Sequence, residues 1–222
     1  MTPAYTARRS LVFLCAIAIT VFAGFALAEP QAGTPAAKDD DILSQNSVWR
    51  DPDTPVLGNP NGNLTVVEFF DYQCPYCRKL APELAQVVKD DGQIRIVLKD
   101  WPIFGDASVL AAKLALAARY QDKYAQAHDA LIAADGKLDA TRIDDLMTKA
   151  GVDVARAKAD LETNRKSIEA VLARNNAQAE AFGFEGTPGF IVGTLRVPGV
   201  VEMKVFKMIV ADARAAAKKK RQ

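Results

Sequence analysis

Two cysteines separated by two residues, Cys74 and Cys77, decide much of what this sequence can encode. They follow residues 64–70, an apolar run of β-forming type, and begin a segment to Lys89 in which apolar residues recur with helical spacing. At the start of a helix, unpaired N–H groups and the positive end of the helix dipole stabilise a thiolate. The second cysteine lies on the same helix face, so the two sulfurs can form a disulfide. We therefore predict thiol–disulfide exchange, with Cys74 as the exposed attacking thiolate and Cys77 as the buried resolving thiol.

Residues 1–28 have the pattern of a bacterial-type secretory signal. Two arginines precede an apolar run over residues 11–27, and the run ends in the cleavage pattern Ala-Leu-Ala. We expect cleavage after Ala28 and export of the mature chain. An uncleaved membrane anchor is the alternative, although a membrane-spanning helix needs about 20 apolar residues. Cleavage also removes Cys15 and leaves a single pair of closely spaced cysteines. One such pair does not stabilise an exported fold by cross-linking it, so we expect its role to be chemical.

Composition argues against two classes of binding site. The 28 Lys and Arg residues are balanced by 27 Asp and Glu residues, which argues against a nucleic-acid partner. A structural zinc site needs four Cys or His ligands, and the chain has three cysteines and one histidine, His128. We therefore expect no metal and no cofactor, and we expect His128 to be a packed or surface residue. Half of a metal site and an inert structural disulfide remain alternative interpretations of the cysteine pair.

The order of the predicted elements is that of an α/β protein. Residues 64–98 read as strand, helix and strand, a unit whose crossover should be right-handed. About 75 residues of helical character follow, with a break expected near Asn164. Residues 190–197 then read as a β-hairpin, and residues 203–217 as a final amphipathic helix.

The segment Phe69-Phe70-Asp71-Tyr72-Gln73-Cys74-Pro75-Tyr76-Cys77 resembles the active-site segment of the DsbA family of periplasmic thiol–disulfide oxidoreductases, which belongs to the thioredoxin superfamily. Three further features agree with this resemblance. Pro82 lies in the following helix, Thr187-Pro188 precedes a strand, and a helical insertion separates the two β-containing parts.

The resemblance implies a thioredoxin fold with an inserted helical domain. The thioredoxin domain would comprise residues 56–104 and 185–222, and the helical domain would comprise residues 105–184. Residues 29–55 are expected to form a flexible segment between the signal peptide, residues 1–28, and the fold.

The resemblance also assigns roles around the cysteines. Glu68 corresponds to an acid buried behind the pair, which accepts the Cys77 proton and whose pKa is raised by burial; a surface acid at a strand end is the alternative. Pro75 and Tyr76 would contact substrates, and Tyr76 would also tune the redox potential.

The Thr187-Pro188 element completes the expected site. The Pro188 peptide bond would be cis, which would place the backbone of Thr187 beside Cys74 to pair with an extended substrate. An ordinary trans turn is the alternative. Lys99 is expected to be a surface lysine, with a position near the site at the end of the second strand as its alternative.

The expected function is disulfide formation in cysteine-containing exported proteins of the periplasm. The resemblance implies a membrane redox partner, either a DsbB-like oxidase or a DsbD-like reductase. Pro75-Tyr76 together with Thr187 also resembles the isomerase and reductase branch that includes DsbC, DsbG and ScsC, so isomerisation or reduction of client disulfides is the alternative. A peptide-binding chaperone without redox activity and a metallochaperone are the remaining alternatives.

Overall fold

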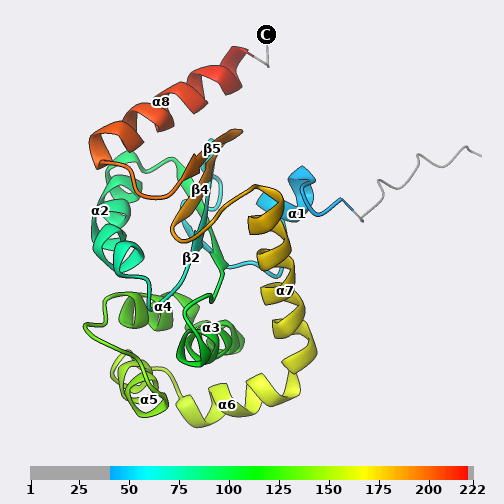
Figure 1. The fold of residues 1–222 in the computed structure, drawn as a ribbon, viewed down its shortest axis with the longest axis vertical. Helices are drawn as coiled ribbons and strands as arrows, with labels where there is room; N and C mark the ends of the chain where they lie inside the picture. Colours follow the sequence, from blue (N-terminus) through cyan, green and yellow to red (C-terminus); the bar gives the residue numbers. More distant parts are fainter. Residues whose placement is uncertain (1–40, 220–222) are drawn as a thin grey trace, which may run out of the picture. The chain divides into compact units, whose positions relative to one another are not determined.

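The computed structural model describes residues 41–219, and a five-stranded mixed sheet forms the centre of this part of the chain (Figure 1). The strands lie in the order β1-β3-β2-β4-β5. Only β2 and β3 run parallel, and the other three pairings are antiparallel. The strands are β1 (Val56–Gly58), β2 (Leu64–Phe70), β3 (Ile94–Asp100), β4 (Gly189–Val192) and β5 (Leu195–Pro198).

The part of the chain that the structure describes contains nine helical segments besides this sheet. They are α1 (Gln45–Trp49), α2 (Pro75–Asp91), α3 (Asp106–Ala118), the 3-10 helix η1 (Arg119–Gln121), α4 (Tyr124–Ile132), α5 (Ala140–Lys149), α6 (Val154–Thr163), α7 (Arg165–Ala181) and α8 (Met203–Lys219). Within residues 41–219, no helix combines the length and the apolar character that a membrane crossing requires.

The predicted strand–helix–strand unit is confirmed. Strands β2 and β3 pair in parallel from Leu64 opposite Ile94 to Phe70 opposite Asp100, and α2 connects them. Both strands are buried on both faces, which explains why β2 is mostly apolar instead of alternating, whereas β3 carries buried charged residues among its apolar ones. The predicted hairpin is confirmed as β4 and β5, and the predicted helix break is confirmed at Asn164, between α6 and α7.

The two faces of the sheet are covered by different helices (Figure 1). Helices α2 and α8 pack on one face, and α1 and α7 pack on the other. The larger hydrophobic cluster joins the first face to the helices between β3 and β4, so the helical insertion and the sheet share one core. The smaller cluster fills the second face; its buried members are Val48, Val67, Phe69, Val97, Trp101, Ala179, Phe184 and Ile191.

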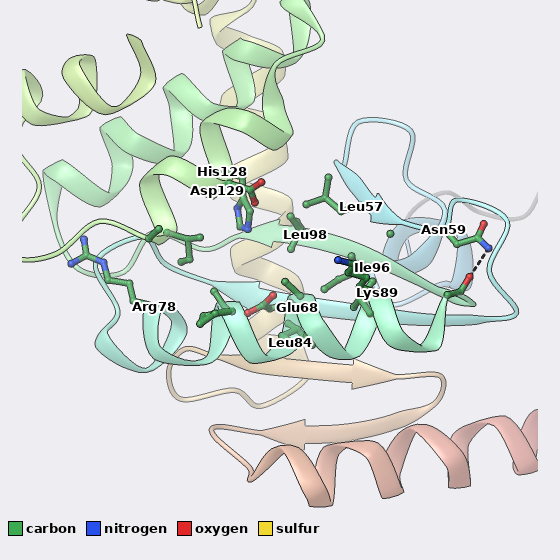
Figure 2. A pocket seen from close by; sticks show the side chains of 18 residues that line it. Leu57, Asn59, Glu68, Arg78, Leu84, Lys89, Ile96, Leu98, His128 and Asp129 are labelled. Carbon is green, nitrogen blue, oxygen red and sulfur yellow. Dashed lines mark hydrogen bonds between the residues drawn. The ribbon is translucent and has the colours of Figure 1, made fainter. Parts of the chain in front are cut away.

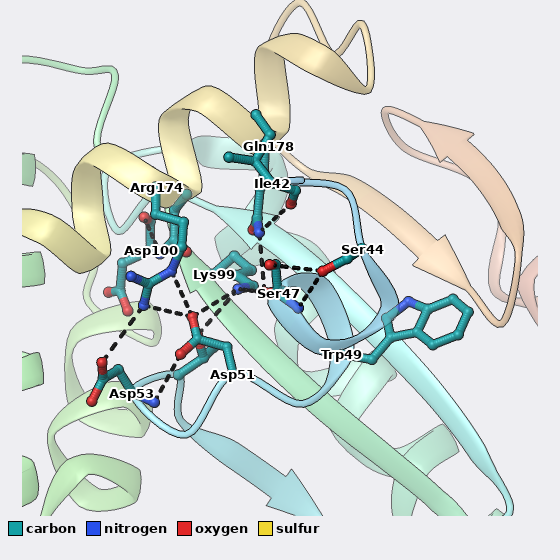
Figure 3. A network of polar contacts seen from close by, with 12 residues as sticks. Ile42, Ser44, Ser47, Trp49, Asp51, Asp53, Lys99, Asp100, Arg174 and Gln178 are labelled. Atoms are coloured by element: carbon teal, nitrogen blue, oxygen red, sulfur yellow. Dashed lines mark hydrogen bonds and ion pairs between the residues drawn. The ribbon is translucent and has the colours of Figure 1, made fainter. Parts of the chain in front are cut away.

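The predicted flexible segment, residues 29–55, is ordered over the part that the structure describes. Residues 41–55 contain α1 and lie along the second face of the sheet, where Val48 is buried. The rest of that segment and the predicted signal peptide lie outside the described residues. The order has a physical cause in a network of polar contacts that joins this segment to β3 and α7 (Figure 3).

Lys99 is the centre of this network, and its expected surface position is wrong. Its side chain is fully buried, and its ammonium group lies 3.6 Å from the Asp51 carboxylate and donates hydrogen bonds to Thr54 Oγ1 and the Ser47 carbonyl. Arg174 of α7 binds the same Asp51 carboxylate at 2.6 Å. These residues are far apart in sequence, so no local pattern could have indicated that they meet.

Candidate active site

Cys74 caps the N-terminus of α2. Its sulfur accepts a hydrogen bond from the backbone N–H of Cys77 at 3.4 Å, and Pro75 occupies the first helical position, where no N–H is needed. The Cys74 thiol donates a hydrogen bond to the carbonyl oxygen of Thr187 at 3.2 Å. The Thr187–Pro188 peptide bond is cis, as the resemblance implied. The structure therefore brings the Cys-x-x-Cys segment and the Thr-Pro element together.

The two cysteines have opposite acidities. A hydrogen bond from the Cys77 thiol, helped by the backbone N–H groups of Tyr76 and Cys77, lowers the pKa of Cys74 to about 6. Burial raises the pKa of Cys77 far above its usual range, and the bond to Cys74 and the charge of Glu68 raise it further. At neutral pH the pair is therefore a Cys74 thiolate beside a Cys77 thiol, which is the state that attacks a disulfide.

Cys74 is not the exposed residue of this segment, contrary to the expectation. It is only 1% exposed, whereas Tyr76 is 62% exposed. The Thr187 carbonyl lies directly against the Cys74 sulfur and contributes to this burial. The two sulfurs are not bonded to each other in the structure, and the Cys74–Cys77 disulfide stays a prediction.

Glu68 lies behind the cysteine pair on β2. Its side chain is buried, so the alternative of a surface acid is wrong. Burial, together with the negative charge of Cys74, raises the pKa of Glu68 to about 8. Because the charge of Glu68 in turn raises the pKa of Cys77, the carboxyl group and the Cys77 thiol are electrostatically coupled.

One side of Glu68 faces a groove of about 770 Å³ between α2 and α4 (Figure 2). Apolar side chains, among them Leu84 and Leu98, form most of its lining. His128 and Asp129 of α4 lie across the groove from Glu68. The carboxyl group therefore borders a cavity that neither cysteine lines.

A second groove, of about 680 Å³, begins at Tyr76 and runs along the loop that carries Thr187. Val200 and Arg196 line its far part. Tyr76 and Val200 are exposed large apolar residues, and such exposure is typical of a surface that binds a partner. An extended chain lying in this groove would meet Thr187 beside the Cys74 sulfur.

The sequence did not single out Gln73 and Arg78, the residues on either side of the Cys-x-x-Cys segment. Gln73 donates a hydrogen bond to the Phe104 carbonyl and accepts one from the Leu138 N–H, each at 3.1 Å. Arg78 donates to the carbonyl oxygens of Tyr72 and Gly136, each at 2.5 Å. These bonds tie the active-site turn to the helical insertion. Tyr72 is 6 positions from Arg78, whereas Phe104, Gly136 and Leu138 lie 31 to 65 positions from the residues that bind them, so no local signal reveals these three contacts.

His128 is a packed residue, as expected. Its ring stacks on Tyr124 with centroids 5.9 Å apart, and its Nδ1 lies 3.3 Å from the Tyr72 hydroxyl. Burial lowers the pKa of His128 to about 4, so the ring is neutral at physiological pH. Nearby, Asp100 is buried, and this burial raises its pKa to about 7. Across residues 41–219, no group of three or more His, Cys, Asp or Glu side chains is arranged to hold a metal ion.

Comparisons with known proteins agree with this geometry. A family model described as thioredoxin matches residues 50–212. A thioredoxin-like oxidoreductase from Silicibacter pomeroyi, known from its crystal structure, is 42% identical with a TM-score of 0.74, and the match covers 78% of this chain and 98% of that one. The thiol:disulfide interchange protein DsbA of Bordetella parapertussis is 29% identical over 144 residues, 63% of this chain and 68% of that protein.

A further relative is much longer than this chain. The Na(+)/H(+) antiporter NhaA 1 of Salinispora arenicola is 28% identical over 171 residues, which are 76% of this chain and 26% of that protein. The chain therefore spans about a quarter of the length of that relative.

Proposed function

Because the chain belongs to the thioredoxin family, we propose that it is a thiol:disulfide oxidoreductase that exchanges disulfides with exported proteins through Cys74 and Cys77. The observation that carries this proposal is the asymmetry of the pair. Cys74 has a pKa of about 6 at the N-terminus of α2, and Cys77 is a buried thiol of raised pKa. An inert structural disulfide needs no such difference.

The proposed direction is oxidation of client thiols. A client thiolate attacks Cys74 Sγ of the oxidised pair, the Cys74–Cys77 bond breaks, and Cys77 leaves as a thiolate. The protonated carboxyl of Glu68 supplies a proton to Cys77. A second client thiolate then attacks the client sulfur of the mixed disulfide, which releases Cys74 as a thiolate. The client loses two electrons and gains a disulfide, and the cysteine pair gains those electrons.

The low pKa of Cys74 supports this direction, because a stabilised thiolate makes the dithiol state favourable and the disulfide a stronger oxidant. One observation favours the alternative of an isomerase or reductase. Tyr76 carries no positive charge to strengthen the Cys74 thiolate, and its side chain points into solvent.

The proposed location is the periplasm, after export through the predicted signal peptide, residues 1–28. Reoxidation of the dithiol would then require a membrane oxidase of the DsbB type, and the alternative direction would require a DsbD-like reductase. The basic residues followed by an apolar run at the N-terminus support export.

The experiment that tests the function measures the redox state of the pair in intact cells. Cells are quenched with acid, free thiols are alkylated with a mass tag, and Cys74→Ser serves as the control that cannot form the disulfide. A pair that is mostly disulfide supports the oxidase. A pair that is mostly dithiol overturns it in favour of the isomerase or reductase. Purified protein that neither oxidises a reduced client nor reduces or reshuffles a client disulfide would contradict the function itself.

A further inference from the structure

A third groove, of about 680 Å³, is lined by Gln73 and Pro75, the residues on either side of Cys74, and shares no lining residue with the groove that Thr187 lines. We call it the lysine groove; its lining includes Pro75, Lys79, Phe104, Ala133, Ala134 and Lys137. Its lining includes Pro75, the residue that follows Cys74, so the groove is next to the reactive cysteine in the chain. The first wall belongs to α2, and the opposite wall is the loop between α4 and α5, part of the helical insertion.

The lysine groove is held open by the two residues that flank the Cys-x-x-Cys segment. Gln73 bonds to Phe104 on one wall and to Leu138 at the end of the other. Arg78 bonds to Gly136 in the middle of the loop. The small side chains of Ala133 and Ala134 leave space between these walls. The groove is therefore preformed, and a ligand need not order the loop.

The charge of the lysine groove is positive. Lys79 and Lys137 are exposed and form no ion pair within residues 41–219, whereas Asp135 is attracted to Arg78. The lining thus contains three cations, Arg78, Lys79 and Lys137, and one carboxylate. Two lysines without partners at the edge of a groove favour an anionic side chain.

The same groove also has an apolar wall. Phe104 is 48% exposed, and the neighbouring Tyr76 is 62% exposed. Exposed large apolar residues around a reactive thiol are typical of a surface that binds an unfolded chain. The partner that fits is therefore an extended polypeptide with both apolar and acidic side chains.

We propose that the lysine groove is a specificity subsite that selects client segments with an acidic residue next to the reactive cysteine, through Lys79 and Lys137. This inference rests on the proposed function, because it concerns the clients of the same cysteine pair. It assigns part of client selection to the helical insertion, which supplies Lys137.

The test uses three peptides that differ only in the two residues flanking one cysteine, which are Asp, Ser or Lys. Each cysteine is activated as a mixed disulfide with thionitrobenzoate. The reduced protein attacks with the Cys74 thiolate, thionitrobenzoate leaves with the bonding electrons, and Cys77 then displaces the peptide thiol. At low salt we expect the acidic peptide to react about tenfold faster than the basic one, and the difference to shrink at high salt.

The variant combines Lys79→Glu with Lys137→Glu, and it should reverse this preference, measured as the ratio of the rates of the acidic and the basic peptide. The matched control combines Lys166→Glu with Lys207→Glu, two exposed lysines of α7 and α8, and causes the same change in net charge. Equal rates for the acidic and basic peptides, or equal effects of the two double variants, would overturn the subsite.

A second readout separates failure of the subsite from failure of the function. The same peptides with serine in place of cysteine are labelled, and their binding is followed by fluorescence anisotropy. If no peptide exchanges but the acidic serine peptide still binds best and loses this advantage in the Lys79→Glu/Lys137→Glu variant, the proposed function fails and the subsite holds. If exchange occurs and binding does not depend on peptide charge, the subsite fails and the function holds.

Discussion

Two buried ionisable side chains of neighbouring strands, Lys99 on one face of the central sheet and Glu68 on the other, have opposite surroundings. On the face covered by α1 and α7, Lys99 is surrounded by Asp51, Thr54 and the Ser47 carbonyl (Figure 3). On the face covered by α2, Glu68 has no hydrogen bond and no ion pair to any residue between 41 and 219, and it borders a groove (Figure 2).

We interpret this difference as one between a charged group that stabilises the fold, Lys99, and an acid that takes part in proton transfer, Glu68. Burying a charge is costly unless partners compensate for it, and Lys99 has such partners. Glu68 has none, so it is protonated at neutral pH and holds a proton that it can give away. For Glu68, the absence of a counter-ion beside a reactive thiol is thus stronger evidence for proton transfer than burial alone.

The largest expected effect comes from removing the structural charge. Replacing Lys99 with Met should lower the free energy of unfolding by about 3 kcal/mol, because Asp51 and Thr54 lose a donor at a site that water does not reach. The rate of disulfide exchange per folded molecule should stay unchanged, since Lys99 lies on the face away from the cysteines. Urea unfolding and an exchange assay on the same samples measure both quantities.

Lys113→Met provides the control for this variant. Lys113 pairs with Glu169 at 2.8 Å on the surface of the helical insertion, where solvent weakens the interaction. Its loss of stability should be much smaller than that of Lys99→Met. Equal losses for the two variants would show that the buried network contributes no more than a surface ion pair.

Replacing Glu68 with Gln should have the opposite pattern, with a loss of rate and no loss of stability. We expect disulfide exchange at neutral pH to slow by about tenfold or more, because Cys77 loses its proton donor and acceptor. Stopped-flow measurement of exchange with a small disulfide, in both directions, tests this. Glu83→Gln, an exposed position on α2, is the control and should exchange at the normal rate.

The stability of the Glu68→Gln variant should depend on pH in a defined direction. The pKa of Glu68 is about 8 in the folded protein against an ordinary value of 4.5. The carboxyl group therefore costs no stability below pH 4.5, and its cost grows as the pH rises to about 8. Relative to the unchanged protein, the variant should gain on the order of a few kcal/mol over this range. A gain that is constant with pH would contradict the raised pKa.

The contrast between the faces also explains what the sequence could and could not predict. The strands, α2 and the Cys74–Cys77 site follow from local patterns, since apolar runs and a two-residue spacing are visible in a short window. Glu68 was also found, because it occupies a fixed place before the cysteines. Glu68, the cysteine pair and α2 lie within one strand–helix unit, and the β4–β5 hairpin is likewise a local element.

The features that were missed depend on contacts between distant parts of the chain. Asp51 joins Lys99 and Arg174, which lie 48 and 123 positions from it, and nothing near Lys99 in the sequence distinguishes it from a surface lysine. The burial of Cys74 depends on the Thr187 carbonyl, 113 positions away. The order of residues 41–55 has the same origin, because its cause is the buried lysine on β3.

The smallest expected effect is that of Glu68→Gln on the pKa of Cys74, and it tests most directly whether Glu68, unlike Lys99, is uncharged. In the reduced protein, the ultraviolet absorbance of the thiolate should rise with a midpoint near pH 6. Glu68→Gln should move this midpoint by less than about half a pH unit, because Glu68 is still protonated at that pH and carries no charge to remove. Cys74→Ser is the control that should abolish the transition. A midpoint that falls by a whole pH unit in Glu68→Gln would mean that Glu68 is ionised at pH 6. Both Glu68 and Lys99 would then be buried charges, and only Lys99 would have partners that compensate for its charge.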